Sequence, residues 1–204
     1  MSESVLSNDA EVSYLTMVSL RRLLSIGGIK RYRDSAESRH RLSMTLFPKE
    51  LGTGSRSTIN VLFRGERSTK ESIVLIRSKI APSNIPGVNT IKEDFSKFKK
   101  GQTVRFRVTV SPIVRSGSKE RFLSDFDEIE NWIAKRLTPS LSDIQVVSSK
   151  SEELQRGKSK NFVKLEQIDG VAKVDDVNSL VESLISGVGR NKSYGAGLLT
   201  VALI

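Results

Sequence analysis

The chain contains no cysteine, one histidine and one tryptophan among its 204 residues. Without cysteine it has neither a disulfide framework nor a thiolate metal site, which is typical of a reducing compartment. No apolar run approaches the roughly 18 residues that span a bilayer, and residues 1–12 lack the basic and apolar regions of a secretory signal. We therefore expect a cytoplasmic protein whose residues 1–12 form a flexible tail.

Common nucleotide-binding motifs are also missing. Gly187 and Gly189 begin a G-x-G-x-x-G pattern, but Lys192 occupies the third glycine position, and the chain has no Walker G-K-S/T. The K/R-G-F/Y-G/A-F-V signature of base-stacking RNA-recognition motifs is absent, and aromatic residues make up only 6% of the chain. These absences argue against a mononucleotide or dinucleotide site and against base stacking on a sheet.

Acidic residues are in the minority, with 23 Asp or Glu against 33 Lys or Arg and a net charge of +10. The basic residues gather in 21–41, 97–121 and 150–164 and in the C-terminal loop, while the remainder of the chain is acidic. Ordinary solvated surfaces are rarely segregated in this way. The pattern predicts an anionic partner, such as nucleic acid or a membrane surface, that the basic stretches share.

The first half contains apolar strands and a short helical pattern. We expect strands at 13–20, 58–65 and 71–78, the last two joined as a hairpin, and a helix around 40–46 that follows a long basic connection. A charged stretch from 91 to 102, which ends with Gly101 and Gln102, then separates this half from the next.

The second half opens with a strongly alternating strand at 103–112. One face carries only apolar side chains, from Val104, Phe106, Val108 and Val110, and the other presents Arg105, Arg107 and Thr109. A helix at 125–137 follows, with the apolar stripe Phe126, Ile129, Trp132, Ile133 and Leu137, which predicts that the tryptophan belongs to the core.

The remaining elements are two strands at 141–149 and 160–168, a helix at 177–185 capped by Asp175 and Gly187, and a buried strand at 198–204. Both halves thus follow the order β-α-β-β-α-β. We predict an α+β fold of two tandem ferredoxin-like (RRM-like) domains, residues 13–92 and 101–204, joined by a linker at 93–100.

The glycine-rich loop SGVGRNKSYGAG has two interpretations from its residues alone. Its glycines free backbone N–H groups and allow close approach, so that with Arg190 and Lys192 it can hold a phosphate of a polymer. Alternatively, the glycines serve only tight turns.

Motifs along residues 13–204 resemble the CRISPR repeat-RNA endoribonucleases of the CasE type. They are, in chain order, HRLSMTLFP (40–48), VLFRGE (61–66), SIVLIRS (72–78), GQTVRFRVTVSPIV (101–114), NWIAKRL (131–137) and GVGRNKSYGAGLL (187–199). The resemblance implies two ferredoxin-like domains around a basic cleft that holds the repeat hairpin. It also implies metal-independent, cofactor-free cleavage at the base of the stem, a 2′,3′-cyclic phosphate product, and retention of the product within the Cascade complex. We expect the free protein to be a monomer.

His40, the only histidine, aligns with the catalytic histidine of that family, seven residues before Phe47. A lone histidine in a basic segment is otherwise an ordinary surface residue. Many relatives carry a helper tyrosine three residues before the histidine, where this chain has Glu37. Candidate helpers are therefore Glu37, which can orient His40 or raise its pKa, and Tyr32.

We expect the RNA contacts to go to phosphates and 2′-hydroxyls, because an A-form stem hides the major groove that would display its bases. The candidate RNA-binding residues are Arg39, Arg41, Arg105, Arg107, Arg115, Lys119, Arg121, Arg156, Lys158, Lys160, Gly189, Arg190 and Lys192.

Two other functions fit the same residues. A non-catalytic RNA-binding subunit of a ribonucleoprotein complex fits the missing tyrosine and the absence of a second histidine. A general basic RNA chaperone or ribosome-associated protein would bind with steep salt dependence and without preference for a hairpin.

Overall fold

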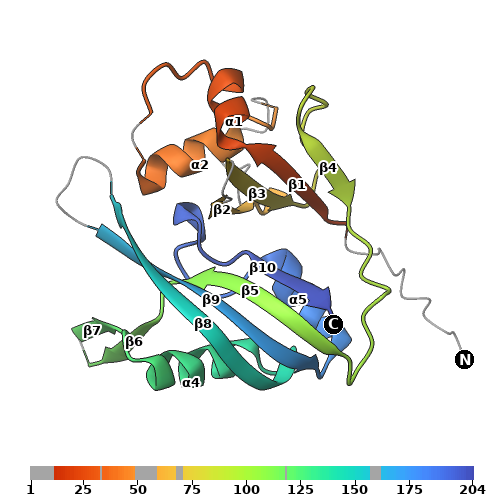
Figure 1. Ribbon diagram of the computed structural model, residues 1–204, viewed down its shortest axis with the longest axis vertical. Coiled ribbons are helices and arrows are strands. Elements are labelled where there is room, and N and C mark those ends of the chain that lie inside the picture. The colour runs from red at the N-terminus through yellow and green to blue at the C-terminus, as the bar shows by residue number, and fades with distance from the viewer. Residues whose placement is uncertain (1–11, 33, 49–58, 68–70, 118, 157–161) are drawn as a thin grey trace, which may run out of the picture.

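A computed structural model describes residues 12–32, 34–48, 59–67, 71–117, 119–156 and 162–204. The described chain forms two four-stranded antiparallel sheets and a separate two-stranded hairpin. The first sheet and its helices occupy the upper half of Figure 1, and the second sheet occupies the lower half. Within these residues, no helix is long and apolar enough to cross a membrane.

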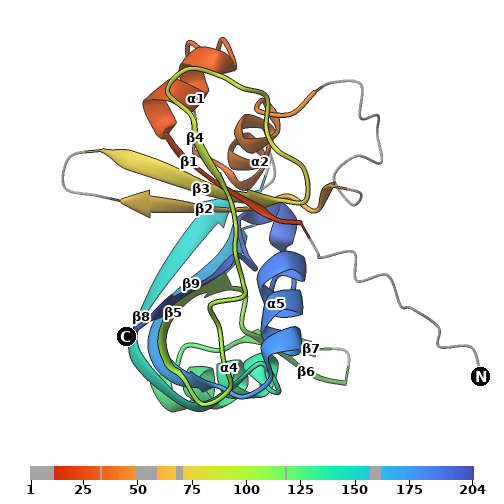
Figure 2. The ribbon, with the colours of Figure 1, turned by 90° about the vertical axis from the view of Figure 1, so that its right-hand side faces the viewer.

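The first sheet has the strand order β2-β3-β1-β4, which is the ferredoxin-like arrangement. Its helices lie on the face turned away from the second half (Figure 2). The elements are β1 (Tyr14–Ser19), α1 (Leu20–Ile26), α2 (Ala36–Met44), β2 (Leu62–Arg67), β3 (Ser72–Ser78) and β4 (Asn89–Lys92).

Three features of this half differ from the prediction. The basic connection begins with α1, which is capped by the Ser19 hydroxyl accepting from the Arg22 N–H. Helix α2 starts at Ala36, four residues earlier than expected, because Ser35 provides its N-cap. The second helix of the β-α-β-β-α-β pattern is missing, since residues 79–88 form turns and extended chain. Ile80, Ile85 and Val88 from that segment pack against the core instead.

The second sheet has the order β10-β5-β9-β8, again ferredoxin-like. The alternation predicted for its first strand is confirmed, because the four apolar side chains of one face are each at most 3% exposed. Helices α4 and α5 bury their stripes in the same core as that face. The elements are β5 (Thr103–Val110), α4 (Phe126–Leu137), β8 (Leu141–Gln155), β9 (Phe162–Val174), α5 (Val177–Ser186) and β10 (Leu199–Leu203).

Several local predictions in this half need correction. Phe126 is 44% exposed because it begins α4 and faces outward, whereas Trp132 packs against the core as predicted. The N-cap of α5 is Asp176, whose side chain accepts from the Ser179 N–H, in place of Asp175; Gly187 ends the helix as expected. The hairpin of β6 (Ile113–Ser116) and β7 (Lys119–Phe122) has no counterpart in the prediction, and β8 and β9 are longer than predicted.

Two buried arginines of the first sheet reach into the second half. Arg64 donates to the carbonyls of Arg107 and Leu198, at 3.0 and 2.8 Å. Arg77 donates to the carbonyls of Leu184 and Leu199 and pairs with Glu93 through two hydrogen bonds. These arginines are 3% and 2% exposed. Removing either would leave buried polar groups without partners, so they hold the two halves together.

The connection between the sheets, residues 93–102, forms neither a helix nor a strand and spans residues 93–100, where the sequence predicts a linker. Glu93 at its start binds Arg77 and also accepts from the Ser13 hydroxyl. Phe98 is 5% exposed and belongs to the core of the second half. The connection is therefore fixed to both halves.

Candidate functional site

His40 lies in the middle of α2, on the same helical face as Ala36 one turn earlier. Its ring stacks on the Phe63 ring of β2, with centroids 6.1 Å apart and an angle of 25° between the planes. The residue is half-buried, and its Nδ1 atom is buried. A ligand therefore cannot reach this imidazole at Nδ1.

The glycine-rich loop lies against α2, although more than 140 residues separate them in sequence. The loop contains the short 3-10 helix η2 (Lys192–Tyr194), drawn in blue beneath α2 in Figure 1. Ala196 and Tyr194 pack with Ala36 and with Leu154 of β8. The fold thus places the two stretches that the sequence analysis singled out for chemistry side by side.

Glycines are required where this loop meets β2. Gly195 has a φ of 92°, and a β-carbon there would come 3.2 Å from the Phe63 ring. Gly187 has a φ of 76°, and its β-carbon would come 2.8 Å from Leu62. Both positions need the left-handed backbone and the close approach that glycine alone supplies. These glycines have the turn and packing role; whether the loop also binds phosphate stays a prediction.

The two cations of the loop occupy different surroundings. The Lys192 ammonium donates to the Ser186 carbonyl at the end of α5, with N–O 2.6 Å, and burial lowers its pKa. Arg190 is 68% exposed, and its guanidinium lies 3.7 Å from the Glu120 carboxylate. Gly189, with a φ of 76°, lies beside Trp132. Arg190 is thus the loop cation that is open to a large anionic ligand.

Arg39 is held between carboxylates from both halves of the molecule. Its guanidinium forms two hydrogen bonds to Asp34, at 2.7 and 2.8 Å, and two to Glu152 of β8, at 2.9 and 2.7 Å. Burial alone would lower the pKa of Arg39, but these hydrogen bonds outweigh it and raise the pKa above its ordinary value. The Arg39 side chain is only 18% exposed. A phosphate could reach it only by displacing a carboxylate.

The two candidate helpers of His40 differ in position. Glu37 is half-buried in the first turn of α2. The Tyr32 hydroxyl donates to Asp34, with O–O 2.9 Å. Burial, reinforced by this hydrogen bond, raises the pKa of Tyr32 above its ordinary value. The phenol is therefore protonated at neutral pH, and its hydroxyl is directed to Asp34.

The other predicted RNA-binding residues fall into three groups. Arg41, Arg105 and Lys119 are exposed, and so are Arg115, Arg121 and Arg156, although these three also contact neighbouring side chains. Residues engaged by neighbouring side chains are Arg107 with Asp169 and Glu66, Arg115 with Glu120, Arg121 with Glu128, and Arg156 over the Tyr194 ring. Lys158 and Lys160 lie outside the described residues.

A cleft of about 520 Å³ separates the two sheets beside α2. Its basic lining residues are Arg39, Arg64, Arg107 and Lys150, and its acidic ones are Asp34, Glu66, Glu152 and Glu153. Among the described lining residues the two signs are equal in number, so this part of the cleft is mixed in charge. Whether a basic cleft holds RNA stays a prediction. The carboxylates hold the arginines by charge-assisted hydrogen bonds, so an anionic ligand has to displace a carboxylate before it can bind one of these arginines.

Sequence reasoning missed Phe63, Asp34 and Glu152. Phe63 sits inside the VLFRGE motif, but an apolar residue in a strand gives no sign of a contact with a histidine. Glu152 is 113 residues from Arg39, and nothing in the spacing indicates that they pair.

Comparison with known proteins assigns the chain to a family. A family model described as CRISPR associated protein matches residues 13–202. Thermus thermophilus Cse3, solved with an RNA representing a pre-cleavage complex, aligns with a TM-score of 0.71 and 23% identity over 94% of this chain and 99% of that chain. Cas6e from Escherichia coli K-12 aligns with a TM-score of 0.68 and 20% identity over 94% of this chain and 100% of that chain.

A chain of a CRISPR RNA-guided surveillance complex aligns with a TM-score of 0.66 and 24% identity, over 94% of this chain and 100% of that chain. At these identities the likeness establishes the fold, which confirms the predicted pair of ferredoxin-like units. No match was found among curated protein sequences.

Proposed function

The chain belongs to the CRISPR-associated protein family, and from this we propose that it is a metal-independent endoribonuclease that cuts CRISPR precursor RNA at the base of the repeat hairpin. The observation that carries the proposal is the position of the only histidine. His40 is half-buried in α2, stacks on Phe63 and lies on the helix that packs against the glycine-rich loop. Of the similar structures, Thermus thermophilus Cse3 was solved bound to RNA, and another is a chain of a CRISPR RNA-guided surveillance complex.

The chemistry needs proton transfer and charge stabilisation. The 2′-oxygen attacks the adjacent phosphorus, the bond from phosphorus to the 5′-oxygen breaks, and the products are a 2′,3′-cyclic phosphate and a 5′-hydroxyl. His40 Nε2 takes part in moving the proton between these oxygens. One proton leaves the 2′-oxygen and one is added to the 5′-oxygen. Because the chain has one histidine, two imidazoles of this chain cannot share these transfers. Glu37 remains the candidate that orients His40.

The loop cations would stabilise the extra negative charge on the phosphorane. Arg190 is open to solvent. Lys192 contributes once its ammonium exchanges the Ser186 carbonyl for a phosphate oxygen. The exposed side chains of Arg41, Arg105 and Lys119 contact the phosphate backbone of the stem. These contacts recognise the shape of the A-form helix and do not read its bases. After the cut the hairpin stays bound, and the protein serves as a subunit of the Cascade complex with its other subunits.

Incubation of the protein with a repeat hairpin in EDTA tests this function. We expect a cyclic-phosphate product from the all-ribose hairpin and none from a hairpin with a 2′-deoxy substitution before the cut. His40→Ala should abolish cleavage while hairpin affinity and the circular dichroism spectrum stay unchanged. Cleavage that survives this substitution would show that His40 is not the catalytic group.

A non-catalytic RNA-binding subunit is the second candidate, favoured by Glu37 in place of the helper tyrosine. It would bind the hairpin tightly and leave the all-ribose substrate intact in the same assay. A general RNA chaperone would bind hairpins and unstructured RNA alike, with a salt dependence of about 0.7 to 0.9 log units per phosphate contact.

A further inference from the structure

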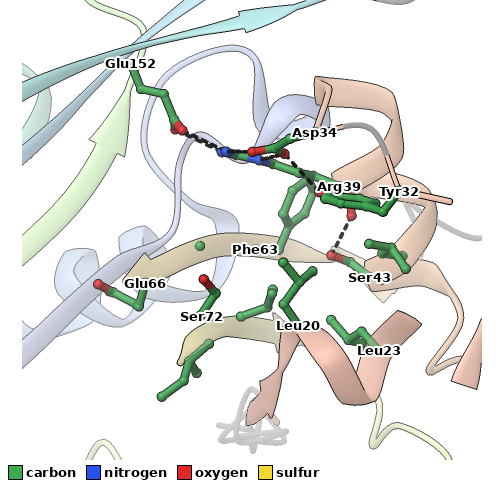
Figure 3. Close-up of a pocket in the computed structure, with 14 residues that line it drawn as sticks. Leu20, Leu23, Tyr32, Asp34, Arg39, Ser43, Phe63, Glu66, Ser72 and Glu152 are labelled. Carbon is green, nitrogen blue, oxygen red and sulfur yellow. Dashed lines mark hydrogen bonds and ion pairs between the residues drawn. The ribbon is translucent and has the colours of Figure 1, made fainter. Parts of the chain in front are cut away.

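A pocket of about 200 Å³ opens at the edge of the first sheet, between α1, α2 and the β2–β3 pair (Figure 3). Its inner wall is apolar and includes Leu23, Leu42 and Phe63, all members of the first core, together with Val74. A dry cavity of about 150 Å³ already accepts a six-membered aromatic ring. The pocket is therefore large enough for a flat heterocycle.

The outer part of the pocket offers planar and polar surfaces. The Tyr32 ring and the Arg39 guanidinium both line it, and Asp34 fixes them by accepting from the Tyr32 hydroxyl and from Arg39 Nε. Glu152 holds the other edge of the guanidinium (Figure 3). RNA-binding proteins commonly stack unpaired bases on aromatic rings and on arginine planes of this kind.

The charge of the described lining residues disfavours a phosphate as the natural occupant. Among them are three carboxylates, from Asp34, Glu66 and Glu152, and one guanidinium, from Arg39. A second anion would be repelled, whereas a neutral ring can donate its amino or imino hydrogens to the carboxylates.

We propose that this pocket binds the nucleobase of the first unpaired nucleotide beyond the cut. Phe63 links the pocket to His40. Its ring forms part of the inner wall of the pocket and also stacks on the His40 ring, with the ring centroids 6.1 Å apart. A base held there keeps its nucleotide next to His40. The proposal rests on the proposed function, which supplies an RNA substrate with a cut at the base of a stem.

Gly65 offers a clean way to fill the pocket. It lines the cavity in the middle of β2, and a β-carbon there would meet open space. Gly65→Ile should therefore place its side chain in the site from a β-carbon that meets no neighbour, and β-branched residues suit strands. Thr103→Ile, at an exposed strand position of the second half, is the matched control, and Gly65→Ala is a milder variant if the isoleucine perturbs folding.

The test measures affinity for a 2′-deoxy, uncleavable hairpin with the normal base or an abasic site immediately beyond the cut. Wild-type protein should bind the abasic RNA about tenfold more weakly, as expected for loss of one stacked base. Gly65→Ile should bind the normal RNA equally weakly and show no further loss with the abasic RNA, whereas Thr103→Ile should behave as wild type. Equal affinity of the wild type for both RNAs, or equal weakening of both by Gly65→Ile, would overturn the proposal.

A fluorescence measurement tests the same proposal without a protein variant. A 2-aminopurine at the same nucleotide should lose fluorescence on binding to wild-type protein, because it stacks in the pocket, and an unchanged signal would contradict the proposal. Failure of the proposed function is recognised separately, since the wild type would then leave the all-ribose hairpin uncleaved in EDTA.

Discussion

Gly195 and Phe63 touch across the junction of the glycine-rich loop and the first sheet, so that the loop supports the same ring on which His40 stacks. The φ of Gly195 is 92°, in the region that favours glycine. Any side chain there has to move the Phe63 ring or the loop.

Gly195→Ala should reduce both stability and cleavage. The left-handed backbone alone costs about 1 to 3 kcal/mol of unfolding free energy for a non-glycine residue, and the 3.2 Å contact displaces Phe63 beneath His40. Denaturant unfolding and the hairpin cleavage rate measure the two effects. Gly101→Ala is the control, because Gly101 has a φ of 85° with open space around its β-carbon. It should lose stability and keep its cleavage rate; an equal loss of cleavage in both variants would refute the role of the contact.

Arg77→Met should lower the free energy of unfolding by about 3 to 5 kcal/mol. The substitution leaves the Glu93 carboxylate, 11% exposed, and the buried carbonyls of Leu184 and Leu199 without their shared donor. Urea unfolding measures the change. Arg121→Met, which breaks an exposed pair with Glu128, should change stability little. Adding Glu93→Gln to Arg77→Met should restore part of the loss, and a strictly additive double variant would argue against the pairing.

Glu152→Gln should tighten hairpin binding, by roughly two- to fivefold. The change removes one of the two carboxylates that hold Arg39 and lowers the negative charge of the cleft. Affinity at several salt concentrations measures it. Glu153→Gln is the matched control on the next residue of β8, where the carboxylate pairs with Lys164. If the two variants bind alike, the gain comes from net charge and not from release of Arg39.

Stability should fall as pH rises above about 10, in part because of Tyr32. In the unfolded chain this phenol ionises near its ordinary pKa of 10.0, while burial raises its pKa in the folded protein. The folded state then binds more protons than the unfolded state, so the free energy of unfolding decreases with pH. Near-ultraviolet absorbance titration should show a late-ionising tyrosine that Tyr32→Phe removes, together with part of the stability loss. A titration that Tyr32→Phe leaves unchanged would contradict this assignment.

The sequence was most informative where one pattern decides the structure. Alternation along 103–110 and the 3.6-residue stripe of 177–185 predicted β5 and α5, because burial of one face dictates both. The sequence pattern did not predict α1, because this helix has only seven residues, two of them arginine, and packing stabilises it. It also failed at 79–88, where scattered isoleucine and valine residues cover the core without a helix.

The candidate site was predictable as a set of residues but not as an arrangement. The family motifs identified His40 and the glycine-rich loop, yet their proximity depends on how the two halves dock. The sequence also shows every arginine as an equivalent cation. Only the fold separates Arg105, which is exposed, from Arg39 and Arg107. Arg39 pairs with Glu152 of β8, and Arg107 pairs with Asp169 of β9.

The buried arginines between the halves have a consequence for substrate length. Because Arg64 and Arg77 complete the hydrogen bonding of backbone carbonyls across the junction, the halves cannot open independently without stranding those groups. This junction therefore fixes the separation between Arg105, the exposed arginine of β5, and the imidazole of α2. Under the proposed function, a stem that is one base pair too long or too short would present the wrong phosphate to His40, and the protein would measure the length of the stem.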